Sequence, residues 1–178
     1  MNSRSLAFSP DSKEVFWSTD FTEFGFYNIV HMRTENGRWS APKLAPFSEI
    51  YHAGSPVFSC DGEKLYFSSS RPREGDAGTS DTNIWVVEKK GRAWSIPRLL
   101  SETVNSNQGE SMQSISRKGT LYFRRGMEMF SSKQKDGVFQ APEGLDISVP
   151  AGARIMAVFV APDEGYLLLE SFGGGGYG

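Results

Sequence analysis

The sequence predicts an all-β fold, namely a partial β-propeller built from four-stranded antiparallel blades. Two observations lead to this prediction: a short phrase recurs along the 178 residues, and each copy ends in an apolar triplet. A third observation argues against long helices, because Gly, Pro and Ser occur throughout and no segment sustains apolar residues at i, i+3 and i+4 over several turns. Such internal recurrence is the signature of a repeat architecture.

The recurring phrase joins a turn signal to a β-rich run. It reads FSPDSKEVFW at residues 8–17 and FSCDGEKLYF at residues 58–67. Proline fixes φ, and Asp or Gly accepts a tight backbone, so each signal predicts the turn of a β-hairpin. The four turn signals are Ser9-Pro10-Asp11, Ser59-Cys60-Asp61, Ser116-Arg117-Lys118 and Ala161-Pro162-Asp163, and the triplets that follow them are Val15-Phe16-Trp17, Leu65-Tyr66-Phe67, Leu121-Tyr122-Phe123 and Leu167-Leu168-Leu169.

A second anchor repeats in phase with the first. It reads GRWSAP at residues 37–42, GRAWSIP at 91–97 and GVFQAP at 137–142. A third β-rich run precedes it, such as residues 83–88. The Trp-Ser-x-Pro part of the second anchor predicts a short outer strand that ends at the proline, because proline cannot donate a hydrogen bond to a strand ladder. Each repeat therefore predicts a four-stranded antiparallel sheet.

The apolar triplets indicate how these sheets assemble. A half-exposed strand alternates apolar and polar residues, whereas the triplets are apolar on both faces, so both faces must be covered. Radial stacking around an axis covers both faces, and repeats of roughly 40 to 50 residues are typical of propeller blades. We therefore predict a single incomplete propeller domain over residues 1–178, with three complete blades at about 5–48, 54–104 and 110–150 and the first half of a fourth at 154–178.

An open arc of blades has consequences for association. Closed propellers have about 4 to 8 blades. An arc that stops short of closure leaves apolar blade faces and strand edges without neighbours, and such surfaces seek partners. We therefore expect the chain to be a fragment of a longer protein or to complete its ring with another copy, and we expect self-association if the ring is left open.

Several of these stretches resemble a known repeat family. Phe8-Ser-Pro-Asp11, Ser68-Ser-Ser-Arg-Pro72, Asn83-Ile-Trp-Val-Val87 and Trp94-Ser-Ile-Pro97 are similar to the TolB-type, WD-like β-propeller repeats of bacterial proteins. The resemblance covers essentially the whole chain and implies the propeller fold. It departs from the family pattern at 28–29 and 83–84, where Asn-Ile replaces the common Asp-Ile-Tyr. Exported relatives imply a periplasmic or cell-envelope location, although residues 1–11 carry no secretory signal.

Composition disfavours several classes of partner. Nineteen Lys and Arg against 21 Asp and Glu give a net charge of -2, which provides no field that would attract nucleic acid or an anionic membrane. No apolar run approaches the ~20 residues of a membrane span. Cys60 is the only cysteine, so an internal disulfide and a Cys-based zinc cluster are excluded. We expect no cofactor, no metal and no catalytic residue, since the sequence contains no Gly-x-Ser-x-Gly, HExxH or EF-hand motif.

Candidate ligand contacts lie in the loops of one face. The loops between the second and third strands and those between blades open on the same face of a propeller, and binding groups concentrate in loops on a rigid scaffold. Arginine offers forked donors to a carboxylate or phosphate, and tyrosine offers a flat amphipathic surface. For Arg71 the structural alternative is a bond to backbone carbonyls that fixes the loop. The candidates are Tyr51, His52, Arg71, Glu110 and Arg124.

The leading functional hypothesis is a non-catalytic propeller module that presents its loop-rich face to a protein, peptide or glycan. The alternative is the propeller part of a glycan-active hydrolase or lyase, and a third possibility is a structural scaffold or a fragment without function. A fold alone does not name a function. A carboxylate pair or a histidine cluster at the axis would favour catalysis, and an axis lined by backbone and hydroxyl groups would favour binding.

Overall fold

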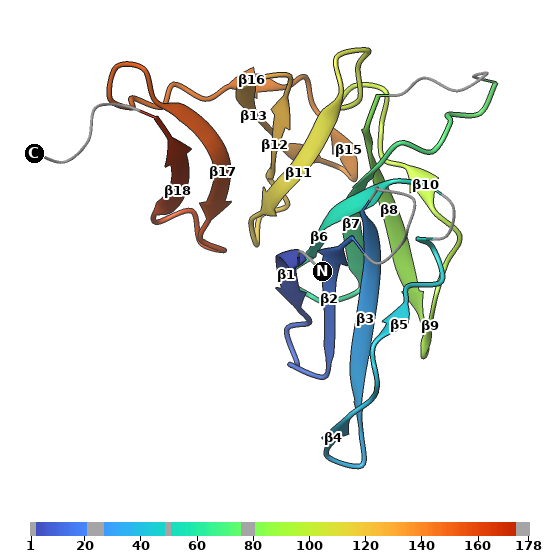
Figure 1. The fold of residues 1–178 in the computed structure, drawn as a ribbon. Helices are drawn as coiled ribbons and strands as arrows, with labels where there is room; N and C mark the ends of the chain where they lie inside the picture. The colour runs from blue at the N-terminus through green and yellow to red at the C-terminus, as the bar shows by residue number, and fades with distance from the viewer. Residues whose placement is uncertain (1–2, 21–26, 49–50, 76–80, 174–178) are drawn as a thin grey trace, which may run out of the picture.

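The computed structural model describes residues 3–20, 27–48, 51–75 and 81–173, and these residues form β-strands and no helix (Figure 1). All strand pairs are antiparallel. The predicted all-β class is therefore confirmed. None of the described residues belongs to a helix long and apolar enough to cross a membrane.

Blades 1 and 2 have the same strand order. Blade 1 contains β1 (Ser3–Phe8), β2 (Glu14–Thr19), β3 (Asn28–Glu35), β4 (Arg38–Trp39) and β5 (Lys43–Leu44), and blade 2 contains β6 (Ala53–Phe58), β7 (Lys64–Ser69), β8 (Asn83–Lys90), β9 (Ala93–Trp94) and β10 (Arg98–Leu99). The main sheets run β1-β2-β3-β5 and β6-β7-β8-β10. The two-residue strands β4 and β9 pair only with the far ends of β3 and β8.

Blade 3 keeps this plan, and blade 4 has two strands. Blade 3 contains β11 (Glu110–Ile115), β12 (Leu121–Arg125), β13 (Glu128–Ser132), β14 (Gln134–Lys135), β15 (Val138–Phe139) and β16 (Glu143–Gly144), and blade 4 contains β17 (Arg154–Val160) and β18 (Leu167–Phe172). Blade 3 runs β11-β12-β13-β16, with β14 and β15 as a separate ribbon at its tip.

The outermost strand differs from the prediction. It lies after the proline of the second anchor, at β5, β10 and β16, whereas the Trp-Ser segment before the proline folds back onto the third strand. Serine fixes this fold-back. Ser40 N–H donates to the Arg33 carbonyl, and its hydroxyl accepts the Arg33 N–H. Ser95 makes the same two bonds with Glu88. The proline ends the tip, and the chain pairs again only beyond it.

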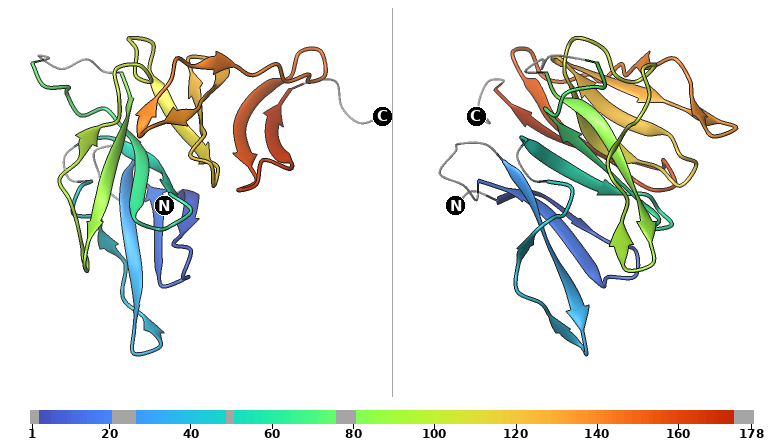
Figure 2. Two further views of the ribbon diagram at one scale, coloured as in Figure 1. Left: turned by 180° about the vertical axis from the view of Figure 1, so that it is seen from behind. Right: turned by 90° about the vertical axis from the view of Figure 1, so that its right-hand side faces the viewer.

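The blades follow one another in an open arc (Figures 1 and 2). The first strands of successive blades, β1, β6, β11 and β17, contact one another and form the inner side of this arc. Blade 1 lies at one end and the β17–β18 hairpin of blade 4 at the other. This arrangement is the radial stacking that the apolar triplets predict.

The hydrophobic core is divided into clusters between neighbouring blades. Between blades 1 and 2 lie Phe16, Ile29, Ala45, Phe47, Ala53, Phe58, Leu65, Phe67, Trp85 and Val87. A second cluster between blades 2 and 3 contains Tyr66 and Phe123, and a third, between blades 3 and 4, contains Met129 and Val158. The Leu65-Tyr66-Phe67 triplet is buried on both faces because its alternate residues belong to different clusters.

The repeated turn signal builds the same hydrogen bonds in blades 1 and 2. Ser9 Oγ donates to Asp11 Oδ1 at 2.6 Å and accepts the N–H of Glu14. Ser59 donates to Asp61 at the same distance of 2.6 Å and accepts the N–H of Lys64. The serine bond, reinforced by a backbone N–H, lowers the pKa of both aspartates below the ordinary range. The phrase recurs because these polar groups define the hairpin turn.

Candidate functional site

The inner strands of the four blades line one groove with a volume of about 1140 Å³. Its walls combine apolar side chains with the hydroxyls of Ser5, Ser55 and Ser111, and two charged side chains, Arg124 and Glu170, reach it from second strands. The groove runs along the inner side of the arc, where ligands and channels of repeat rings are found. It is therefore our candidate site.

Each inner strand carries a β-bulge in the groove wall. The register shifts between residues 4 and 7, 54 and 57, 112 and 114, and 155 and 157. At two of these bulges the backbone of Ser5 (φ 53°) and Ser55 (φ 51°) is left-handed, a conformation that costs a non-glycine residue about 1 to 3 kcal/mol. The bulges redirect backbone N–H groups, since Ser55 N–H donates to Ser18 Oγ of blade 1 at 3.0 Å.

One equivalent position of the four repeats holds serine in the first two blades and a charged residue in the last two. Ser18, Ser68, Arg124 and Glu170 each follow the apolar triplet directly. Ser18 and Ser68 accept backbone N–H groups from the next blade. Arg124 makes no such bond among the described residues, and in its interface Gln113 Oε1 accepts the Val158 N–H at 3.1 Å.

Arg124 is consequently a cation that faces the groove. Its side chain is half-buried and has no hydrogen-bond or ion-pair partner among the described residues. Of the five predicted contacts, it is the only one that lines the groove. A half-buried guanidinium offers paired donors to a ligand carboxylate or phosphate.

Arg71 instead holds loops together. Its guanidinium lies over the rings of Tyr51, Phe67 and Trp85, 5.2 to 5.7 Å from their centroids. It also donates to Ser69 Oγ at 3.2 Å and to the Phe47 carbonyl. Such cation–π and carbonyl contacts fix the segment between blades 1 and 2 against blade 2. Arg71 and Tyr51 thus come together, away from the groove, as the structural alternative for Arg71 requires.

Glu110 belongs to a buried ion pair. Its Oε1 is 2.9 Å from Nε of Arg125 and accepts a 2.5 Å hydrogen bond from the Ser106 hydroxyl. Arg125 also donates to the Val104 carbonyl at 2.8 Å and lies against the rings of Phe123 and Phe130. Because the Glu110 side chain is fully buried, its carboxylate serves to join blade 3 to the segment before it.

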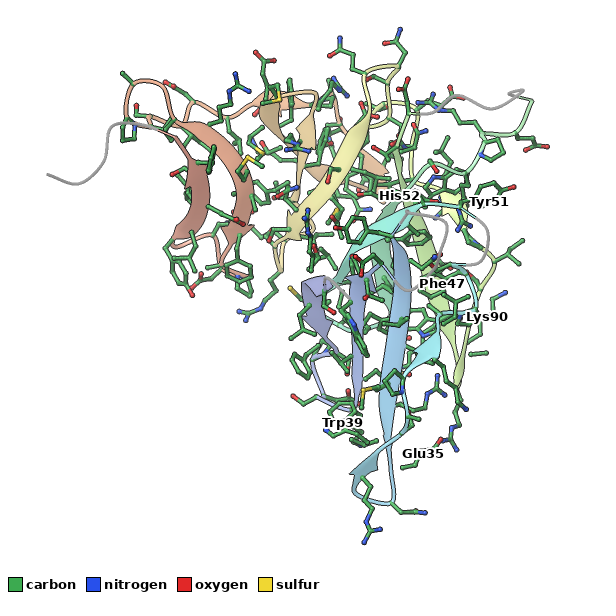
Figure 3. All side chains as sticks on the ribbon, in the orientation of Figure 1. Glu35, Trp39, Phe47, Tyr51, His52 and Lys90 are labelled. Carbon is green, nitrogen blue, oxygen red and sulfur yellow. The ribbon has the colours of Figure 1, made fainter. Side chains whose placement is uncertain are left out.

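His52 lies beside Tyr51, directly before β6 and between blades 1 and 2 (Figure 3). Its Nδ1 accepts the Tyr27 N–H at 3.2 Å, and its ring meets the Tyr27 ring edge-on. Burial lowers the pKa of His52 below its usual value of 6.5. The neutral ring is therefore the form that the folded chain uses.

The stability of the fold should depend on pH through His52. In the unfolded chain, His52 binds a proton at a higher pH than it does in the folded chain. The contribution of neutral His52 to the free energy of unfolding is therefore complete above about pH 6.5 and decreases as the pH falls towards the lowered pKa of the folded state. A glutamine at this position can still accept the Tyr27 N–H but does not titrate. We expect His52→Gln to flatten the dependence of unfolding free energy on pH between about 7 and 5, measured by urea denaturation; an unchanged dependence would contradict this role.

Two structural arginines, Arg125 and Arg73, are missing from the predicted set. Arg73 donates to Asn83 Oδ1 at 3.1 Å through Nε and also bonds the Ser106 carbonyl. For Arg125 the repeat contains a signal, because its counterparts Thr19 and Ser69 are buried. That position faces the blade interior, whereas Arg124 beside it faces the groove.

Comparisons with known proteins identify the fold. No family model matches the chain, and no curated protein matches it in sequence. Among solved structures, TolB from Acinetobacter baumannii matches with a TM-score of 0.60 at 16% identity, over 94% of this chain and 37% of TolB. A puromycin-hydrolyzing peptidase from Mycobacterium tuberculosis matches with a TM-score of 0.58 at 17% identity, over 90% of this chain and 24% of the peptidase. The matched regions are propeller domains. The fold is a β-propeller.

The propeller likeness extends to a prolyl endopeptidase, with a TM-score of 0.53 at 16% identity over 89% of this chain and 23% of that one. At such identities the likeness concerns the fold. This propeller chain spans between 23% and 37% of the length of these three solved structures. The sequence resemblance to TolB-type repeats is thereby supported at the level of architecture.

Proposed function

We propose that the chain is a non-catalytic propeller module that binds a protein, peptide or glycan segment in its inner groove. The observation that carries the proposal is Arg124, a half-buried guanidinium without a partner among the described residues, in a groove of about 1140 Å³. The apolar walls suit aliphatic or aromatic side chains, and the serine hydroxyls suit backbone amides. These features together favour a peptide with an acidic group opposite Arg124.

The chemistry of the groove favours binding over catalysis. Glu170 is the only carboxylate residue along it in the part of the chain that the structure describes, and neither His31 nor His52 reaches it. A general acid–base pair requires two groups that converge on one reacting bond. Because the described groove residues provide no such pair, the alternative of a glycan-active hydrolase or lyase is less well supported than binding.

A second candidate function is the propeller part of a peptidase. Two of the similar solved structures are a puromycin-hydrolyzing peptidase and a prolyl endopeptidase, and this chain spans about a quarter of each. In that case the groove would receive peptide, and catalytic groups would come from elsewhere. Both candidates therefore make the groove a peptide-binding surface.

The test is a random-peptide display library selected on the folded chain, with a glycan array as the second arm. Selected peptides are synthesised, and their Kd values are measured by isothermal titration calorimetry. We expect Arg124→Ala to weaken binding roughly 10- to 100-fold, the range for a charge-assisted hydrogen bond. Arg98→Ala is the matched control, because Arg98 lies on the outer strand β10. Equal Kd values for wild type and Arg124→Ala would contradict the proposal, and hits confined to the glycan array would contradict a peptide ligand.

A further inference from the structure

The two ends of the arc carry the two halves of one repeated interface. Phe16, Tyr66, Tyr122 and Leu168 occupy the same place in the four triplets, which we call the contact position. Phe16 of blade 1 packs against Phe58 and Trp94 of blade 2, with ring centroids 5.6 and 5.8 Å apart. In the described part of the chain, Leu168 on β18 is 59% exposed, and no further blade packs against it.

Blade 1 presents the matching half, and none of the described residues occupies it. Phe8 and Trp39 are the repeat counterparts of Phe58 and Trp94. They meet edge-to-face at 6.3 Å, much as Phe58 and Trp94 lie 6.0 Å apart. Around them is an open apolar pocket of about 370 Å³, which Leu6, Val15 and Met32 also line. The receiving site for a contact-position side chain is therefore preformed on blade 1.

The polar part of the interface is repeated as well. In the interfaces between blades 1 and 2 and between blades 2 and 3, the residue two places after the contact position accepts a backbone N–H from the bulge of the next blade: Ser18 from Ser55, and Ser68 from Met112. Glu170 holds that place in blade 4, and Ser5 corresponds to Ser55. Ser5 has a φ of 53° against 51° for Ser55, so its bulge keeps the shape that serves this bond.

Charge at the two ends is complementary. Arg4 precedes the bulge residue Ser5 and is exposed, and Glu170 is exposed with no ion-pair partner among the described residues. Joining the ends through the repeated interface would place the Glu170 carboxylate beside the Ser5 N–H and near the Arg4 guanidinium. Ion pairs already cross internal interfaces, since Lys89 pairs with Glu14 at 2.9 Å and Lys118 with Glu164 at 3.0 Å.

We propose that a second copy of this chain docks head-to-tail on the first, with blade 1 of each copy against blade 4 of the other. Leu168 enters the pocket beside Phe8 and Trp39, and Glu170 pairs with Ser5 and Arg4. This contact joins two different surfaces, and such heterologous contacts close into a ring when the rotation allows. Two copies supply six complete blades and two two-stranded ones, and closed propellers have about 4 to 8 blades. The inference does not depend on any groove ligand.

The experiment measures the mass of the purified chain in solution. Sedimentation equilibrium over a concentration series is expected to give twice the 19.7 kDa chain mass. Glu170→Lys and Arg4→Glu each place like charges together, and each should weaken the pair about tenfold or more. The double variant Glu170→Lys/Arg4→Glu restores opposite charges and should recover most of the affinity. Glu102→Lys, an equal charge change in the segment between blades 2 and 3, is the control and should leave the affinity unchanged.

Two further variants test the apolar contact without disturbing the fold, because the replaced side chains are exposed. Leu168→Arg and Trp39→Ala should each reduce the mass towards that of a single chain. A single-chain mass for wild type up to the solubility limit would overturn the proposal. So would a double-mass species that survives both Glu170→Lys and Leu168→Arg, and so would open-ended assemblies larger than two copies.

Discussion

Replacing Arg125 with methionine is expected to lower the free energy of unfolding by about 3 kcal/mol, because it leaves the buried carboxylate of Glu110 without its cation. Arg125 also bonds the Val104 carbonyl and lies against the rings of Phe123 and Phe130. Methionine retains much of the packing volume, so the loss measures mainly the broken ion pair and hydrogen bonds. Urea denaturation followed by tryptophan fluorescence gives the value.

Two companion variants separate the ion pair from general effects of charge. Arg98→Met removes an arginine whose side chain is 62% exposed and whose nearest carboxylate oxygen is 3.7 Å away, and it should cost less than about 0.5 kcal/mol. Arg125→Met combined with Glu110→Leu removes both buried charges and should recover much of the lost stability. A single Arg125→Met variant as stable as Arg98→Met would show that the pair does not stabilise the fold.

The fold follows from the sequence because its main determinants are local and repeated. The Ser-x-Asp turn signals make short-range hydrogen bonds within a hairpin, and apolar triplets at matching positions require cover on both faces. Neither property depends on where distant segments lie. The prediction for the outermost strand was wrong because two local arrangements suit the same Trp-Ser-x-Pro residues. These residues can pair at the sheet edge, or they can fold back onto the third strand, as Ser40 and Ser95 do in the structure.

The candidate site was only partly predictable. Loop position and residue type favoured Arg71, Glu110 and Tyr51, but hydrogen bonds and ring contacts within the fold engage these side chains. Whether an arginine faces a ligand or a carbonyl depends on segments that meet only after folding, such as the Phe47 carbonyl beside Arg71. Arg124 and Arg125 show the same limit at adjacent positions. Successive side chains of a strand point to opposite faces of the sheet, so Arg124 faces the groove whereas the next residue, Arg125, faces the blade interior.

The groove and the two arc ends are also physically related. Arg4 and Glu170 line the groove as well as belonging to opposite ends of the arc. A docked second copy would therefore enclose the groove and place its charged pair in the wall. Arg124, on β12, belongs to neither end. Its substitution should alter ligand binding without altering association, so the two proposals can fail separately.

Replacing Phe16 with alanine should have the largest effect of any apolar substitution considered, about 4 kcal/mol of unfolding free energy. Phe16 is fully buried at the contact position, with the rings of His31, Phe47, Phe58 and Trp94 at centroid distances of 5.3 to 5.9 Å. Truncation removes a side chain that contacts all four rings at once, and the cost grows with the cavity that remains.

Ile96→Ala is the appropriate control for Phe16→Ala, since Ile96 is an apolar residue that is 87% exposed on a blade tip. It should change the unfolding free energy by less than about 0.5 kcal/mol. Chemical denaturation of both variants at the same protein concentration provides the comparison. If blade 2 did not pack on blade 1, Phe16 would be as exposed as its counterpart Leu168, and the two substitutions would cost similar amounts. Similar costs would therefore contradict the stacked-blade arrangement itself, whereas a large difference would locate the main stabilising contact of the propeller between neighbouring blades.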